Sequence, residues 1–116
     1  MKLKLTIGEK ILIATMVDNP TTRDFLTLLP LSLTLTDYNS TEKISELPKK
    51  LSLKSAPEGY KPSIGDITLY APWGNLAMFY KDFSYSTGLI LLGKIDSGVE
   101  TLEAAGPIKA MIEPVR

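Results

Sequence analysis

Residues 65–98 constrain the fold more than any other part of the chain, because they contain three apolar stretches separated by turn residues. In 66–71 apolar and polar side chains alternate, which is the period of a half-buried strand. A second stretch, 76–81, follows the bend Pro72-Trp73-Gly74. The third, 89–95, opens on an unbroken apolar run, so we expect a strand covered on both faces near the middle of the structure. This segment predicts a fold built on strands.

The rest of the chain has the same strand period. Apolar residues alternate with Lys and Thr over 3–7, and the pattern resumes after Gly8-Glu9, which predicts a hairpin. Loop residues, rich in Pro and Gly, dominate 55–63. Further strands are expected at 31–37, within 41–49 as a short edge strand or turn, from residue 50, and at 108–113.

Two short helices are predicted between the strands. Asn19 offers a cap, Pro20 suits the first helical position, and Pro30 ends the element, which gives a helix over 20–29. The sequence Ser97-Gly-Val-Glu has the form of a capping box, so a second helix is expected over 99–105. Helices are too few for alternating strand–helix units. We therefore predict a mainly β fold, a closed antiparallel β-barrel of about eight strands with two short helices, as a single domain over 1–116.

Composition excludes several functions. Thirteen basic residues balance thirteen acidic ones, so no net field attracts nucleic acid or an anionic membrane. The chain has no His and no Cys, which excludes a Ser-His-Asp triad, a thiolate nucleophile and the usual zinc ligands. We predict no metal site and no cofactor. The N-terminus lacks a continuous apolar segment, and no run is long enough to span a membrane, so a cytoplasmic protein is expected.

Several motifs resemble those of a known family. They are Asn19-Pro-Thr-Thr-Arg-Asp-Phe-Leu, Gly65-Asp-Ile, Tyr70-Ala-Pro-Trp-Gly-Asn, and Leu92-Gly-Lys-Ile within the longer Gly-rich stretch 88–102. In this order they resemble the cyclophilin fold, and over nearly the full length the chain resembles the small cyclophilin-like proteins of prokaryotes, most of which have no assigned activity. The resemblance implies a cyclophilin-like barrel.

The resemblance also bears on catalysis. Cyclophilin prolyl isomerases carry a Gln and a Phe on the strand after a Gly-rich turn, and the resemblance places Leu76 and Met78 at these positions. Their catalytic Arg should fall within 41–53, where the only basic residues are lysines, namely Lys43, Lys49 and Lys50; the chain's two arginines are Arg23 and Arg116. The active-site His is missing. A flexible Lys is a poor substitute for the planar Arg fork that stabilises a twisted amide.

We therefore predict a non-catalytic binding domain for a small apolar ligand or a peptide segment. The alternative is a weak peptidyl-prolyl cis-trans isomerase that uses Lys43 or Lys50 as the electrophile. Another interpretation is self-association through an aromatic patch that includes Phe83 and Tyr85.

Each candidate binding residue also has a structural interpretation. Trp73 either presents a rigid aromatic surface beside Pro72 and Gly74 or covers one end of the core. Asn75 either hydrogen-bonds a ligand carbonyl or serves the turn, and Met78 either lines a groove or fills the core. Arg23 either anchors an anionic ligand or is solvated. The predicted ligand-binding residues are Tyr70, Trp73, Asn75, Leu76, Met78, Tyr80 and Arg23.

Overall fold

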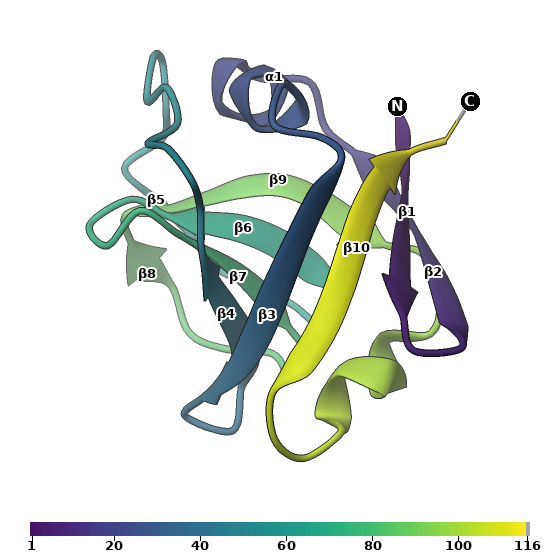
Figure 1. The fold of residues 1–116 in the computed structure, drawn as a ribbon. Coiled ribbons are helices and arrows are strands. Elements are labelled where there is room, and N and C mark those ends of the chain that lie inside the picture. Colours follow the sequence, from purple (N-terminus) through teal and green to yellow (C-terminus); the bar gives the residue numbers. More distant parts are fainter. Residues whose placement is uncertain (116) are drawn as a thin grey trace.

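The chain forms a closed antiparallel barrel of eight strands (Figure 1). The computed structural model describes residues 1–115, so Arg116 lies outside the described residues. The predicted barrel is confirmed. Around the barrel the order is β1 (Lys2–Ile7), β10 (Ile108–Pro114), β3 (Leu31–Tyr38), β4 (Glu42–Glu46), β7 (Asn75–Phe79), β6 (Asp66–Tyr70), β9 (Leu89–Ile95) and β2 (Lys10–Met16).

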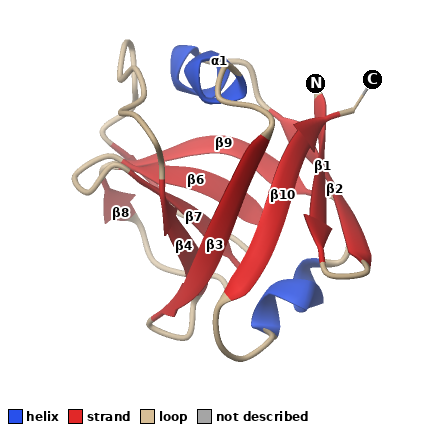
Figure 2. Ribbon diagram, in the orientation of Figure 1, coloured by secondary structure: helices blue, strands red, loops and turns tan. Residues whose placement is uncertain are grey.

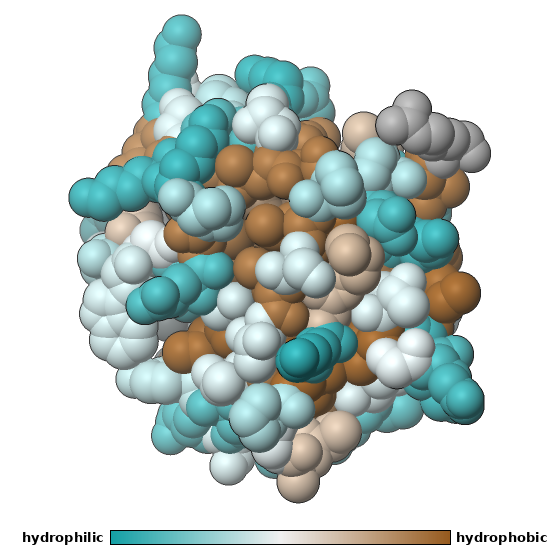
Figure 3. Space-filling view, viewed as in Figure 1, coloured by the Kyte–Doolittle hydropathy of each residue, from teal (hydrophilic) through white to brown (hydrophobic). Residues whose placement is uncertain are grey.

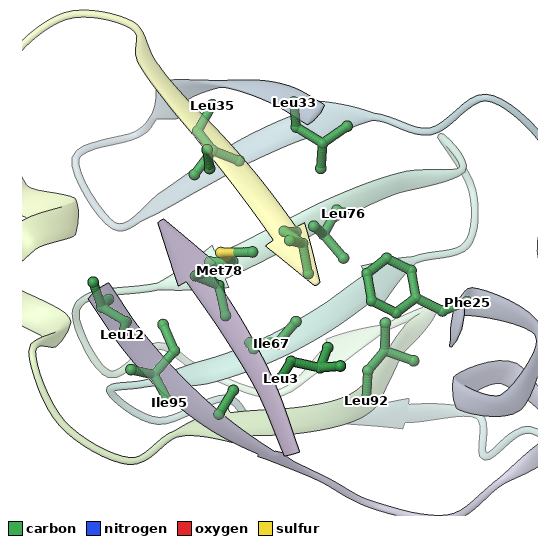
Figure 4. Packing of buried hydrophobic residues seen from close by; sticks show 14 of the residues in the cluster. Leu3, Leu12, Phe25, Leu33, Leu35, Ile67, Leu76, Met78, Leu92 and Ile95 are labelled. Carbon is green, nitrogen blue, oxygen red and sulfur yellow. The ribbon is translucent and has the colours of Figure 1, made fainter. Parts of the chain in front are cut away.

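The core fills the barrel because alternate side chains of each strand point inward. In β1, for example, Leu3, Leu5 and Ile7 are buried whereas the residues between them are partly exposed. The helix α1 (Pro20–Leu26) lies over one end of the barrel, and the short 3-10 helix η1 (Val99–Glu103) lies at the other (Figure 2). The packed interior is shown in Figure 4.

Both predicted helices exist, with differences at their ends. Asn19 caps α1 as predicted, since its Oδ1 accepts a hydrogen bond from the Thr22 N–H, but α1 ends at Leu26 and not at residue 29. The prediction of a capping box before η1 is wrong. The N-cap of η1 is Gly98, whose φ of 86° turns the chain, and no side chain makes a cap hydrogen bond there.

The segment after β3 departs most from the prediction. β4 lies between β3 and β7, so it is an interior strand of the wall and not an edge. The strand expected from Lys50 is absent, because the backbone of Ser52 bonds to α1. Its N–H donates to the Asp24 carboxylate at 2.7 Å, and its carbonyl accepts from the Thr21 hydroxyl at 2.7 Å.

A second, smaller sheet lies outside the barrel. It consists of β5 (Gly59–Tyr60) and β8 (Ser86–Thr87), which the sequence did not predict. Tyr60 packs on a cluster formed by outward side chains of the wall, namely Ala77, Phe79 and Leu89. Leu89 joins this outer cluster while Ile90 and Leu92 join the core, so the prediction that β9 is covered on both faces is confirmed.

Candidate functional site

The outer face of the barrel carries a groove of about 470 Å³, which we call the outer groove. Its floor contains the outward side chains of Ile44 on β4, Phe79 on β7 and Leu89 on β9. These side chains point outward because their neighbours in each strand fill the interior. The remaining lining residues are Tyr38, Asn39, Glu42, Tyr70, Trp73, Asn75, Phe83, Ser86 and Thr87. An apolar floor with a few polar groups around it is typical of a ligand-binding site.

Trp73 forms part of the groove wall. It lies in the turn between β6 and β7, which Gly74 closes by adopting a φ of 69° and donating its N–H to the Tyr70 carbonyl at 2.8 Å. Trp73 is 60% exposed, so it does not cover the core. Its ring meets those of Tyr38 and Tyr70 edge-on, with centroids 5.6 and 5.2 Å apart. Two aromatic neighbours therefore hold an exposed indole at the groove.

Asn75 presents an unused acceptor at the same groove. Its side chain is on the outer face of β7, and the residue is only 5% exposed. Its Nδ2 donates to the Leu76 carbonyl at 3.0 Å, whereas its Oδ1 is buried and has no hydrogen-bond partner within residues 1–115. A buried acceptor without a partner costs free energy, which a ligand N–H would recover. The unbonded atom is therefore an acceptor, whereas the Nδ2 that a ligand carbonyl would need already donates to Leu76.

The comparisons with known proteins identify the family. A model of the cyclophilin-like family matches residues 5–113. The chain belongs to the cyclophilin-like family. The solution structure of a hypothetical protein from Archaeoglobus fulgidus is similar, with a TM-score of 0.67 and 14% sequence identity, over 97% of this chain and 93% of that one. At this identity the likeness concerns the fold alone. No curated protein matches the chain.

Among residues 1–115, no three His, Cys, Asp or Glu side chains lie close enough together to hold a metal ion. None of the helices in that range has the length and apolar character needed to cross a membrane.

Leu76 and Met78 do not line the outer groove, contrary to the prediction. Both side chains are fully buried and point into the barrel (Figure 4). Their outward neighbours on β7 are Ala77 and Phe79, which belong to the outer cluster. For Met78 the structure therefore supports the alternative of core filling. The resemblance therefore assigned ligand contacts to residues that lie one position before the outward-facing residues of β7.

Tyr80 and Arg23 are also away from the groove lining. The Tyr80 hydroxyl donates to the Asp37 carboxylate; burial, and then this bond, raise the pKa of Tyr80 to about 12. Arg23 on α1 is exposed and forms an ion pair with Asp18. Of the predicted residues, the structure brings together Tyr70, Trp73 and Asn75.

The lysines considered as electrophiles do not reach the groove. Lys43 points into the barrel, is 2% exposed, and donates through Nζ to the Ala104 carbonyl at 3.0 Å. Its Nζ is also 3.6 Å from the Asp37 carboxylate. Lys49 pairs with Asp24 of α1, and Lys50 is exposed on the neighbouring loop. The alternation of β4 explains the result for Lys43, since its neighbours on either side face outward.

Sequence reasoning missed Glu42 as a groove residue. It is on β4 opposite Phe79 of β7, with its side chain on the outer face. Burial, and secondly the charge of Asp37, raise the pKa of Glu42 to about 7. Near neutral pH the carboxyl is therefore partly protonated, and the groove carries less negative charge than its composition suggests. A firm strand prediction over 42–46 would have revealed it through alternation.

This raised pKa predicts how stability depends on pH. Because Glu42 binds its proton more tightly in the folded state, the free energy of unfolding falls as the pH rises from about 4.5 to about 7 and then levels off. The Glu42→Gln variant lacks this fall and is more stable than wild type at pH 8 by about 2 kcal/mol, allowing for partial exposure. Urea unfolding between pH 4 and pH 8 measures both. Glu46→Gln, which removes an exposed carboxylate from the same strand, is the matched control, and identical profiles for all three proteins contradict the prediction.

Proposed function

We propose that this cyclophilin-like domain is a binding domain without catalytic activity, and that its ligand places an apolar group in the outer groove. The ligand is a small apolar molecule or a peptide segment. The observation that carries the proposal is the groove itself, in which the exposed Trp73 lies beside an apolar floor. Asn75 also lines the groove, and its buried Oδ1 has no hydrogen-bond partner within residues 1–115. Rigid aromatic walls provide contact area at a low entropic cost.

The charges around the groove argue against prolyl isomerisation. Rotation about the peptide bond has a barrier of about 18–20 kcal/mol, and lowering it requires a fixed donor that stabilises the twisted amide. Among the residues that line the groove in the described chain, none is Arg or Lys, and Glu42 is the ionisable carboxyl there. We expect two-dimensional exchange NMR on Ala-Pro peptides to show no rate enhancement. An enhancement that Trp73→Ala abolishes would contradict the non-catalytic part of the proposal.

The apolar part is tested with a neutral fluorescent probe. Trp73 is the only Trp in the chain, so energy transfer from it to N-phenyl-1-naphthylamine reports binding near the groove. Thr87 lines the groove and is exposed, so Thr87→Tyr should occupy the space above the floor and weaken probe binding about tenfold, the effect of losing roughly one apolar side-chain contact.

Leu53→Ala is the matched control, because Leu53 is an exposed apolar side chain that does not line the groove. Its probe affinity should equal that of wild type. The proposal fails if the probe does not bind, or if wild type and Thr87→Tyr bind it equally well.

A further inference from the structure

The barrel is closed between β3 and β4 by a short ladder that covers only part of the two strands. The two strands pair only from Thr36 opposite Ile44 to Tyr38 opposite Glu42. Beyond this point they diverge toward the end covered by α1 (Figure 1), so that β3 pairs only with β10 while β4 pairs only with β7. A hollow of about 660 Å³ lies there, which we call the wall opening. In Figure 3, apolar surface is visible beside the upper half of β3 on this face.

The pairing of β10 with β1 and β3 shows which backbone groups of β3 face the wall opening. In an antiparallel pair, hydrogen-bonded and non-bonded residues alternate along each strand. The Val115 N–H donates to the Lys2 carbonyl, so odd-numbered residues of β10 bond to β1 and even-numbered ones, such as Ala110, bond to β3. Ala110 lies opposite Leu33, so the N–H and C=O of Leu33 face β10. The backbone groups of its two neighbours therefore face the wall opening.

These neighbours, Ser32 and Thr34, both line the wall opening. The β3–β4 ladder ends at Thr36 opposite Ile44, so within residues 1–115 it includes neither Ser32 nor Thr34. Together they present two N–H groups and two carbonyls at strand spacing, which is the pattern that an additional antiparallel or parallel strand completes.

A second observation connects the wall opening with the outer groove. Ile44, Trp73 and Asn75 line both hollows, so they form one continuous surface. Asn75, whose buried Oδ1 has no hydrogen-bond partner within residues 1–115, belongs to this shared lining, and the N–H of a peptide backbone is the kind of group that this oxygen would accept. Glu46 borders the wall opening, is exposed, and has no ion-pair partner among the described residues. Its carboxylate favours a cationic neighbour.

We propose that an extended peptide with a Lys or Arg next to an apolar residue binds in the wall opening as a strand added to β3, with its apolar side chain in the outer groove. This inference rests on the proposed function, since it uses the same groove, and it names the ligand class. Backbone pairing with Ser32 and Thr34 provides affinity, the groove selects the apolar side chain, and Glu46 selects the cation. A small apolar molecule would use the groove alone and leave the β3 edge unpaired.

The test uses the peptide acetyl-Lys-Val-Phe-Val-Lys-amide and the ¹⁵N-labelled protein. On binding, the amide protons of Ser32 and Thr34 should shift downfield together with the indole N–H of Trp73. The same peptide N-methylated at both Val residues and at Phe keeps every side chain but loses strand pairing along either edge, so it should bind about tenfold more weakly and leave the two amides unshifted.

A matched pair of variants tests the β3 edge. Thr34→Pro removes the N–H that faces the wall opening and leaves the ladder to β10 intact, since Thr34 does not bond to that strand. We expect about a tenfold loss of peptide affinity, with Thr34→Ala as the control that retains the N–H. Unchanged binding of N-phenyl-1-naphthylamine to Thr34→Pro would show that the variant is folded and that its groove is intact.

The outcomes distinguish the two proposals. If the peptide shifts Trp73 but not the amides of Ser32 and Thr34, and binds Thr34→Pro as well as wild type, strand addition is overturned while groove binding stands. If the peptide does not bind but the naphthylamine probe does, the ligand class is overturned. If neither binds, the proposed function fails as well.

Discussion

Replacing Phe25 by Ala should lower the free energy of unfolding by about 4 kcal/mol, the upper part of the range for a large side chain lost from a core. Phe25 is 1% exposed and extends from α1 into the end of the barrel, near Leu92 (Figure 4). A domain of this size has a total stability of roughly 5–15 kcal/mol, so the loss removes a large part of it. Urea unfolding followed by circular dichroism measures the change.

Phe25→Leu is the matched control, because it keeps most of the buried volume. We expect it to cost about 1.5 kcal/mol, well below the cost of the Ala variant. Equal losses for the two variants would mean that the end of the barrel collapses around the smaller side chain, and that α1 is not anchored mainly through Phe25.

The fold was predictable wherever one side of a strand is buried and the other is solvated. β1 has this pattern, since its Leu and Ile residues alternate with Lys and Thr. The start of α1 was predictable for a different reason, because Asn19 caps the helix and Pro20 suits its first turn. The segment after β4 was not predictable, because Leu51 is buried and its neighbour Ser52 is held by side chains of α1. That contact depends on the assembled fold and leaves no periodic signal.

The outer groove was only partly predictable, for a reason that lies in β7. All five residues of this strand are buried, because the outer cluster covers the face that does not point into the barrel. Apolar side chains therefore occupy both faces, and the sequence does not indicate which set points inward. The resemblance had assigned Leu76 and Met78 to the groove, and the pattern of this strand gave no signal that Ala77 and Phe79 face outward instead. Trp73 and Asn75 were identified because the turn residues beside them mark the strand end.

The motif Gly65-Asp66 has a structural role that explains why it stood out. Gly65 adopts a φ of 94°, donates its N–H to the Phe79 carbonyl at 2.8 Å, and accepts from the Ile95 N–H at 2.8 Å. It thereby connects β7 and β9 at the start of β6. The following residue, Asp66, is 1% exposed and holds the chain that leads from β5. The motif therefore positions the outer layer over the barrel wall.

Replacing Asp66 by Ala should lower the free energy of unfolding by about 3 kcal/mol, because it removes the buried carboxylate on which several partly buried donors converge. The Asp66 carboxylate accepts from the Tyr60 hydroxyl and the Ser63 N–H, both at 2.8 Å, and Lys94 Nζ lies 3.3 Å away. Burial, and secondly the bond to Asp66, raise the pKa of Tyr60 to about 12. Its hydroxyl therefore stays protonated, and remains a donor, at neutral pH.

The same substitution should loosen β5 and with it the side of the outer groove formed by β8. Tyr60 pairs with Ser86, and Ser86 lines the groove. Hydrogen exchange at the amides of these two residues should therefore accelerate more than exchange in β1. Asp66→Asn, which keeps an acceptor oxygen but not the charge, should lose about 1 kcal/mol and retain slow exchange. Equal acceleration in β1 and β5 would indicate global destabilisation, and would contradict a specific role for Asp66 in holding the outer layer against the barrel.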